Sequence, residues 1–399
     1  MKIGSKKKQT VLRMGIAGLG VAGAMIIPAV NKHPHFQLAA IARREKDSLG
    51  EHEKSLNAEI FGDIEQLCHS PNVDVVYIST PTPYHKEHVL LAAECKKHVI
   101  VEKPMALRLD DADTMIRAAE KNGVRLMVGH SHSYEPAIQK MRDIVLDGQL
   151  GQLKMVNNWY FNDWIYRPRL QEELDTSLGG GVTYRQGAHQ IDIIRYIAGG
   201  RVRSVRATTG IWDEERPAEG SHTIFLDFEN DASATAVYSG YDHFPSMELT
   251  YWIHESGRKL GEKMYYAAKG GSSAADEDQE ELKKKQRLYR LEQAMRSGSK
   301  SHPLFFGLTV VSCEKGDMRQ SPRGLYIYDR VKKSEITIPR SRTGRDAMLD
   351  EMYRAVVHDV PPAHDGLWGK ANLEVCIAAL QSSKEKREIR LSHQYGLDG

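Results

Sequence analysis

The chain has 399 residues, of which 41% are hydrophobic and 27% charged, and its formal net charge is +2. This length suffices for two domains with separate cores, and the near-neutral charge gives no argument for nucleic-acid binding. The four cysteines are too far apart for metal or redox pairs and suit reduced thiols, and no apolar stretch beyond the N-terminal one could span a bilayer. We therefore expect a cytoplasmic protein without a membrane segment.

The first predicted element is an apolar strand, Val11–Ala17, which runs into a glycine-rich turn with the pattern G-x-G-x-x-G and then into a helix. In a dinucleotide-binding fold the first glycine allows the tight turn, and the second lets a pyrophosphate approach the backbone. The third lets helix and strand pack closely. The predicted cofactor contacts in this loop are Gly18, Gly20, Val21, Ala22 and Gly23.

A basic segment before this loop gives it a rival interpretation. The Lys6–Lys8 run followed by apolar residues is also typical of a secretory signal peptide. However, Arg13 interrupts the apolar run, and cleavage after Ala22 would destroy the phosphate loop. We therefore interpret residues 1–10 as a solvated basic tail.

Residues 11–150 alternate short apolar runs with helical segments, which indicates an α/β Rossmann-type domain with a doubly wound parallel sheet. The predicted strands are Val11–Ala17, Gln37–Arg43, Val73–Ser79, His98–Val101 and Val124–Gly129. The predicted helices are Val21–Asn31, Glu45–Asn57, His85–Lys97, Asp110–Asn122 and Pro136–Asp147.

Residues 151–399 have a different texture and are predicted to form an α+β domain with a mostly antiparallel sheet. Apolar and polar residues alternate along its strands, as they do in sheets with one wet face. The predicted strands are Leu153–Phe161, Ser204–Trp212, His222–Phe228, Ala232–Tyr241 and Glu248–His254. A charged segment at 269–301 is predicted to be an exposed insertion, and Arg345–Val357 and Leu373–Lys384 to be helices.

Two arginines end the second predicted strand, about twenty residues beyond the phosphate loop. An acidic residue at this point holds the 2′-hydroxyl of an adenosine ribose, whereas arginine fits a 2′-phosphate. Arg43 and Arg44 therefore favour NADP, and a solvated strand end is the alternative.

The third predicted strand runs into a Thr-Pro-x-Pro loop at the edge where open α/β sheets bind ligands. Thr80, Pro81 and His85 are predicted cofactor contacts on this loop and the following helix. His85 and His88 lie one turn apart, a spacing that could bind a metal, but no nearby acidic or thiol side chain completes a set. We favour a capping or core role for these two histidines.

A Glu-Lys pair ends the fourth predicted strand, where neither side chain belongs in a core unless it is paired or functional. Glu102 and Lys103 are therefore predicted to face the cofactor, and partial burial would lower the pKa of Lys103 towards working pH. A surface turn stopped by Pro104 is the alternative.

Histidines and one arginine follow at two further points. His130 and His132 end the fifth predicted strand and are expected to bind substrate by hydrogen bonds rather than to bind a metal. A triple glycine at 179–181 would let the backbone pass close to a ligand. On the helix that follows, Arg185 and His189 are four residues apart and would offer one fixed cation and one proton carrier. Incidental polar residues at a helix start are the alternative.

Jointly, four motifs resemble the glucose–fructose oxidoreductase, inositol dehydrogenase and rhizopine-catabolism (Gfo/Idh/MocA) family: GLGVAG, STPTPYH, EKP and GGGVTYRQGAHQID. The resemblance runs from Val11 to about Leu391 without the insertion. It implies a Rossmann domain, a C-terminal domain with a large open sheet that another subunit covers, and a nicotinamide cofactor. It also implies that Lys103 and His189 line the active site. The family usually has Asp where this chain has Arg185, and this departure favours an anionic substrate.

A narrower resemblance, to the phthalate 4,5-cis-dihydrodiol dehydrogenase branch and its NAD, is carried by VGHSHSYEP, by the segment from Asn157 to Asp192 and by FFGLTVVSCEKGDMRQSPRGLYIY. A carboxylated substrate needs fixed cations with planar donors, and a flat ring suits aromatic side chains. The predicted substrate contacts are Arg185, Tyr184, His132, Arg167, Arg169 and Trp164. Ordinary sheet packing is the alternative for the aromatic residues, which are Trp159, Tyr160, Trp164 and Tyr166.

The expected activity is the NAD(P)-dependent oxidation of a carboxylated cyclic cis-dihydrodiol to a catechol, with Lys103 and His189 accepting or relaying the hydroxyl proton. A sugar or inositol dehydrogenase is the alternative enzyme, and a non-enzymatic, cofactor-binding regulator is the alternative of another class. The choice between NAD and NADP stays open, because the arginine pair and the narrower resemblance point in opposite directions. The expected partners are a small anionic substrate and further copies of the chain, without nucleic acid, metal or membrane.

Overall fold

The computed structural model describes residues 10–44, 56–253, 257–263, 265, 302–339 and 343–397. The predicted charged insertion at 269–301, nearly all of the basic tail and most of the predicted helix at 45–57 lie outside these ranges.

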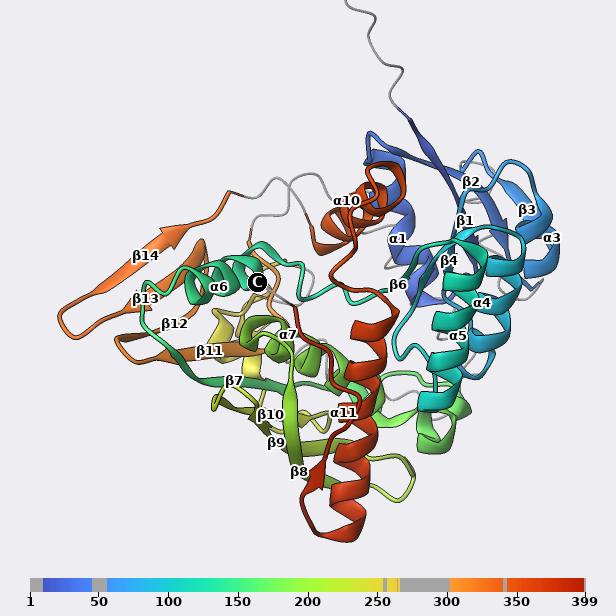
Figure 1. Cartoon of the computed structure of the whole chain (residues 1–399). Coiled ribbons are helices and arrows are strands. Elements are labelled where there is room, and N and C mark those ends of the chain that lie inside the picture. The colour runs from blue at the N-terminus through green and yellow to red at the C-terminus, as the bar shows by residue number, and fades with distance from the viewer. Residues whose placement is uncertain are drawn as a thin grey trace, which may run out of the picture.

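The first sheet has six parallel strands in the order β3-β2-β1-β4-β5-β6 (Figure 1). The strands are β1 Leu12–Ala17, β2 Phe36–Ala42, β3 Glu59–Phe61, β4 Val75–Ile78, β5 His98–Val101 and β6 Leu126–Val128. The helices between and after them are α1 Val21–Lys32, α3 Ile64–His69, α4 His85–Glu94, α5 Leu109–Asn122 and α6 Pro136–Leu146. The predicted doubly wound parallel sheet is confirmed, and only the short elements β3 and α3 were not expected.

The central strands of this sheet are buried on both faces, which explains their near-continuous Val and Ile sequences. Every residue of β4 is at most 1% exposed. Because all six strands are parallel, the loops after β1, β2, β4, β5 and β6 meet at one edge. This edge holds every candidate residue of the first sheet.

Within the part of the chain that the structure describes, the second sheet has nine strands in the order β14-β13-β12-β11-β7-β10-β9-β8-β15, and only the β10–β7 pair is parallel. The strands are β7 Leu153–Phe161, β8 Val202–Gly210, β9 Ser221–Phe228, β10 Ser233–Ser239, β11 Leu308–Cys313, β12 Gly316–Ser321, β13 Gly324–Tyr328, β14 Lys333–Thr337 and β15 Ile389–Arg390. The prediction of a large, mostly antiparallel sheet is confirmed.

The predicted strand Glu248–His254 is wrong. A 3-10 helix, η7, occupies Ser246–Thr250 instead, and Tyr251 and Trp252 follow with φ angles of 60° and 57°. Two successive left-handed residues turn the chain back on itself and end any extended run. Apolar alternation alone could not reveal this turn.

One face of the second sheet is wet, as predicted. Trp159 on β7 and Phe225 on β9 are 44% and 45% exposed, and β10 lies between them in the sheet, with Val237 opposite Trp159 and Thr235 opposite Phe225. The other face packs against the helix α7, Ala188–Ala198, and the long helix α11, Gly366–Glu385. That a second copy of the chain covers the wet face stays a prediction.

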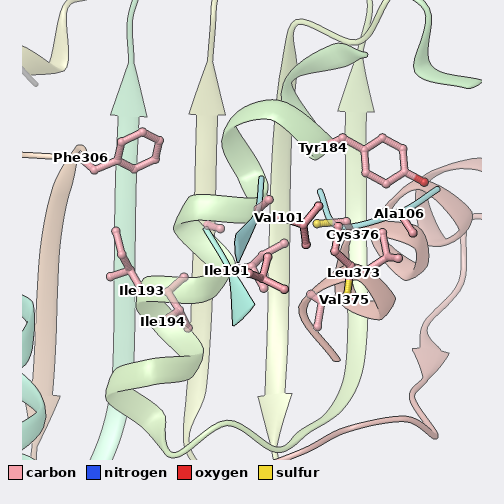
Figure 2. Packing of buried hydrophobic residues seen from close by; sticks show 14 of the residues in the cluster. Val101, Ala106, Tyr184, Ile191, Ile193, Ile194, Phe306, Leu373, Val375 and Cys376 are labelled. Carbon is pink, nitrogen blue, oxygen red and sulfur yellow. The ribbon is translucent and has the colours of Figure 1, made fainter. Parts of the chain in front are cut away.

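The long C-terminal helix α11 contacts elements of both sheets, whereas α10, Gly344–Val357, packs on the first domain (Figure 1). The helix α10 packs against α1, and α11 contacts β8, β6, α5 and α7. Figure 2 shows Val101 of β5, Ile191 of α7 and Leu373 of α11 in one cluster of buried side chains. No helix among the described residues is both long and apolar enough to cross a bilayer.

Candidate active site

The loop after β1 is built as a phosphate cradle. Gly18 has a φ of +92°, and a Cβ there would lie 3.0 Å from the backbone of Ser79 and Thr80. A Cβ on Gly23 would lie only 2.0 Å from the carbonyl oxygen of Gly18, whereas one on Gly20 would meet nothing closer than 3.8 Å. The space at Gly20 and the N-terminus of α1, which no side chain caps, fit a pyrophosphate. The residues therefore fit a dinucleotide.

Arg43 and Arg44 follow β2 at the same edge as this cradle, as predicted. The Arg44 side chain is exposed and that of Arg43 is half-buried. Their position is the one at which an adenosine ribose is read in this fold. Recognition of a 2′-phosphate by these two arginines stays a prediction.

The histidines after β4 hold loops together. His85 is 1% exposed and lies between the carbonyl oxygens of Pro104, 3.0 Å from Nδ1, and Thr80, 2.8 Å from Nε2. Burial lowers the pKa of His85 to about 4, so the ring is neutral and can donate to only one of these oxygens. His88 Nδ1 lies 2.8 Å from the Thr80 hydroxyl. His85 thus positions the Thr80–Pro81 loop, as the capping role predicted, and its ring nitrogens face carbonyl oxygens rather than a cofactor.

Lys103 lies at the end of β5, where the Glu102 carboxylate accepts a hydrogen bond from the Tyr77 hydroxyl. The ammonium of Lys103 donates to the carbonyl oxygen of Arg185 over 2.7 Å, which joins the two sheets at this point. Burial lowers the pKa of Lys103 to about 8, Glu102 opposes this shift, and the guanidinium of Arg185 adds to it. The lysine is therefore poised to exchange a proton near neutral pH.

Arg185 lies in a π-helical turn, Thr183–Gly187, and not in the α-helix that was predicted. The backbone N–H of Ala188 donates to Thr183, five residues back, and α7 begins only there. Such turns are frequent at functional sites. The Nε of Arg185 is buried and has no hydrogen-bond partner among the described residues, so its guanidinium is available to a ligand.

The triple glycine is explained by protein packing and not by the close approach of a ligand. A Cβ on Gly180 would lie 2.5 Å from the carbonyl oxygen of Glu173, and one on Gly181 would lie 2.2 Å from the Glu219 carboxylate. Glu219 in turn accepts from the backbone N–H of Thr183 at 3.3 Å. The glycines therefore allow a buried carboxylate to hold the start of the π-helical turn.

His189, in the first turn of α7, packs against other aromatic rings. Its ring lies edge-on to His132, with centroids 4.6 Å apart, and 5.0 Å from Phe306. Burial lowers the pKa of His189 well below 6.5, and the charge of Lys103 adds to this. The imidazole is therefore neutral at pH 7, a hydrogen-bonding group beside the Lys103 ammonium. No group of three metal-ligating side chains occurs within the described ranges.

Of the six predicted substrate contacts, two aromatic residues are buried in packing and two arginines are paired with carboxylates. Tyr184 is 7% exposed and packs in the core near Ala106 and Cys376 (Figure 2), because neighbouring helical residues point in different directions. Trp164 is 2% exposed beneath the Arg169 guanidinium, whose carbon lies 4.0 Å from the ring centroid. Two carboxylates compensate the remaining cations: Asp163 binds Arg167 at 2.7 Å, and Glu173 lies 3.7 Å from Arg169.

Sequence reasoning missed two residues of this site. Phe306, just before β11, contacts both active-site histidines, His132 and His189. Arg345, on the first turn of α10, lies close enough to His189 to lower its pKa. Gly344 brings it there, because a Cβ at Gly344 would lie 2.0 Å from the Ser131 carbonyl oxygen. Nothing local in the sequence signals either contact, since both segments are more than 100 residues from their partners.

Two family models match most of the described chain. Residues 12–130 match the oxidoreductase family with the NAD-binding Rossmann fold, and residues 138–258 match the GFO/IDH/MocA C-terminal domain. These matches cover the phosphate cradle, Lys103, Arg185 and His189.

Relatives match over nearly the whole chain. The 1-carboxy-3-chloro-3,4-dihydroxycyclohexa-1,5-diene dehydrogenase of Comamonas testosteroni is 34% identical over 382 residues, which are 94% of this chain and 95% of that protein. The myo-inositol 2-dehydrogenase of Thermotoga maritima is 31% identical over 58% of this chain and 71% of its own. A solved structure from Bordetella bronchiseptica RB50, provisionally assigned as a dehydrogenase, is 38% identical with a TM-score of 0.87 and covers 96% of this chain and 100% of its own. The chain is therefore an oxidoreductase that belongs to the GFO/IDH/MocA family.

Proposed function

We propose that the enzyme oxidises a carboxylated cyclic cis-dihydrodiol, of the phthalate 4,5-dihydrodiol type, to the catechol. The observation that carries this proposal is the Nε of Arg185 beside Lys103, a buried atom of a half-buried side chain, because an arginine without a carboxylate partner among the described residues suits an anionic ligand. The similarity to the Comamonas testosteroni enzyme, whose name specifies a carboxylated dihydrodiol, supports the same substrate class.

The charges around the site also favour an anion. The guanidinium of Arg185 acts on Lys103, and that of Arg345 acts on His189. An acidic substrate would bring the negative charge that these cations lack, whereas a neutral polyol would leave them uncompensated. A planar guanidinium can bind a carboxylate through two parallel hydrogen bonds, which also fixes the orientation of the ring.

Lys103 and His189 supply the proton chemistry that such an oxidation needs. As the C–O bond of the alcohol becomes a carbonyl, the neutral amine of Lys103 accepts the hydroxyl proton. The neutral ring of His189 holds the reacting oxygen by a hydrogen bond, and the rings of Phe306 and His132 pack against this imidazole. A nicotinamide held at the phosphate cradle would supply the acceptor for the hydride of the carbinol carbon. The resulting keto form tautomerises to the catechol, and aromaticity makes this step downhill.

A sugar or inositol dehydrogenase is the competing candidate, favoured by the similarity to the Thermotoga maritima enzyme. Steady-state turnover of phthalate dihydrodiol, inositols and aldoses by the same preparation decides between the two. We expect the carboxylated diol to give the largest kcat/KM, and turnover of the polyols alone would contradict the proposal.

The pH dependence of kcat/KM should show the ionisation of Lys103. Because the pKa of Lys103 is lowered to about 8, its amine form appears as pH rises through that value. We therefore expect kcat/KM for diol oxidation to rise with pH around 8, while His189 stays neutral and contributes no transition above pH 6.5. A steady-state profile that rises only near the ordinary lysine pKa of 10.5 would show that Lys103 is not buried in the working enzyme.

The cofactor of the proposed enzyme is NAD or NADP, and the arginines after β2 supply the test. Replacing Arg43 or Arg44 by Ala should weaken NADP binding by roughly 1–3 kcal/mol if a charge-assisted bond to the 2′-phosphate is lost. NAD, which lacks that phosphate, should bind almost unchanged. Isothermal titration with both dinucleotides measures the difference in binding free energy. An equal loss of affinity for the two would show that these arginines are solvent-exposed residues at the strand end that do not recognise the 2′-phosphate.

A further inference from the structure

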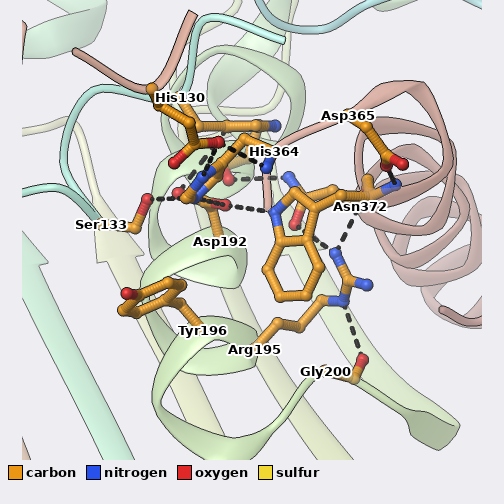
Figure 3. Close-up of polar contacts among 12 residues, drawn as sticks. His130, Ser133, Asp192, Arg195, Tyr196, Gly200, His364, Asp365 and Asn372 are labelled. Atoms are coloured by element: carbon orange, nitrogen blue, oxygen red, sulfur yellow. Dashed lines mark hydrogen bonds and ion pairs between the residues drawn. The ribbon is translucent and has the colours of Figure 1, made fainter. Parts of the chain in front are cut away.

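A cluster of titratable side chains is buried next to the residues of the candidate active site, and Figure 3 shows three of its members, His130, Asp192 and His364. The cluster consists of His130, Asp192, Glu351 and His364, which are 2%, 0%, 8% and 1% exposed. They come from four separate segments: the loop after β6, α7, α10 and the loop before α11. Burying charges is costly unless they are paired, so this arrangement needs a physical reason.

Asp192 is at the centre of this buried charge cluster. Its Oδ1 accepts a hydrogen bond from the Trp368 indole N–H at 2.8 Å and lies 3.8 Å from Nε2 of His364. Its Oδ2 lies 4.0 Å from Nδ1 of His130, which is within ion-pair distance but longer than a hydrogen bond, and neither atom has a hydrogen-bond partner among the described residues. Although burial opposes ionisation, the interactions with His130 and His364 and the hydrogen bonds of Ser133 and Trp368 together outweigh it and lower the pKa of Asp192. The carboxylate is therefore charged and directed at His130.

His364 lies between this carboxylate and that of Glu351. Its Nε2 lies 2.9 Å from the Ser133 hydroxyl, and its Nδ1 lies 3.5 Å from the Glu351 carboxylate. Burial disfavours the imidazolium, but Glu351 and Asp192 outweigh it and raise the pKa of His364 above 6.5. His364 is thus held between two carboxylates, and Asp192 keeps one oxygen for His130.

His130 connects the cluster to the proposed proton-handling pair. Burial lowers its pKa to about 4, so it is a neutral ring with a single N–H at pH 7. It lies close enough to His189 and Lys103 to interact with both electrostatically. The ring nitrogen that carries the proton is set by what the other nitrogen meets. Here Nδ1 faces a carboxylate oxygen, which favours a proton on Nδ1 and leaves Nε2 as an acceptor.

We propose that Asp192 is a positioning residue that holds His130 in its Nδ1–H tautomer and thereby presents an acceptor, Nε2, to the Lys103–His189 pair. An unprotonated Nε2 on His130 stabilises the Lys103 ammonium that forms when the substrate proton is taken up. A protonated Nε2 would repel that ammonium. The inference rests on the proposed role of Lys103 in proton uptake and not on the identity of the substrate.

The tautomer itself can be observed in the wild-type protein. With ¹⁵N-labelled histidine, the Nδ1 and Nε2 shifts of His130, assigned by their loss in His130→Gln, should show a neutral ring protonated on Nδ1. A ring protonated on Nε2 would overturn the proposal. This measurement needs no substrate, so its outcome is independent of whether the proposed function is correct.

The variant Asp192→Asn tests the consequence for catalysis. An amide can donate to Nδ1, which inverts the tautomer and places an N–H beside Lys103, as removal of the charge from an orienting carboxylate does in catalytic triads. We expect kcat to fall at least about tenfold and the transition in the pH profile to move below that of wild type, with KM for the dinucleotide unchanged. The charges facing His130 in this experiment are those of Asp192, His364, Lys103 and Arg195.

Asp74→Asn is the matched control, because it makes the same chemical change in an ion-paired carboxylate at the opposite edge of the first sheet. Asp74 pairs with Arg13 at 2.8 Å, and its loss should lower stability without moving the pH profile. A merely structural role of Asp192 would make the two variants alike, with thermal stability lowered and the pH transition in place, and this result would overturn the proposal. Failure of Asp192→Asn to fold leaves the wild-type tautomer measurement as the deciding result.

Discussion

Replacing Lys103 by methionine should abolish turnover and leave dinucleotide binding nearly unchanged. The ammonium donates to the Arg185 carbonyl oxygen, and burial has already lowered its pKa to about 8, so the side chain is prepared to accept a proton. Methionine fills a similar volume without a titratable group. Loss of a general base typically costs a factor of about 10² to 10⁴ in rate. Single-turnover reduction of NAD or NADP measures the chemical step directly.

Dinucleotide titration is the control for this variant, because the phosphate cradle at Gly18–Gly23 lies after a different strand. Unchanged affinity together with lost turnover assigns the effect to proton uptake. A Lys103→Met enzyme with a near-wild-type rate would remove Lys103 from the mechanism, and loss of cofactor binding would show that its bond to Arg185 is mainly structural.

The sequence was sufficient to predict those parts of the site that depend on local rules. The glycine pattern after β1 requires a particular φ angle at Gly18 and close packing at Gly23, and both occur in the structure. Lys103 was predictable because a charged pair at the end of a buried strand has few non-functional explanations. Parallel strand order then places these groups at one edge without any knowledge of side-chain contacts.

The errors come from contacts between residues far apart in sequence. Nothing near the triple glycine reveals that Glu219 occupies the space above it, and the spacing of Arg185 and His189 cannot reveal a π-helical turn. Arg345 is absent from the prediction because its distance from His189 is set by the docking of α10 on the Ser131 loop. Periodicity describes one element at a time, whereas these contacts depend on how elements pack.

The two arginines that pair with carboxylates, Arg167 and Arg169, show a different source of error. Asp163 and Glu173 lie four residues from Arg167 and Arg169, so both pairings were visible in the sequence. A count of cations near a motif overestimates the positive charge of a site unless such pairs are removed first. After this correction, Arg185 is the cation on which the substrate proposal depends.

Replacing Arg185 by aspartate restores the residue that the resemblance to the family implies at this position, and we expect it to reverse the charge preference of the site. The guanidinium that would bind a substrate carboxylate is lost, and an anion takes its place. We therefore expect kcat/KM for the carboxylated dihydrodiol to fall. The corresponding loss of transition-state stabilisation should be roughly 2–5 kcal/mol, which is the range for removing one partner of a hydrogen-bonded charge pair in a desolvated site. Neutral diols should lose far less.

Cofactor affinity separates this effect from a general loss of structure. The Arg185 backbone, which accepts from Lys103, is retained in Arg185→Asp, so the proton-handling pair should still assemble. Arg185→Gln is the matched variant, because it removes the charge without adding repulsion, and it should lie between wild type and Arg185→Asp on the carboxylated substrate. An equal loss on charged and neutral diols would make Arg185 structural. Full retention of carboxylate turnover would move the anion site to Arg345, whose guanidinium acts on His189.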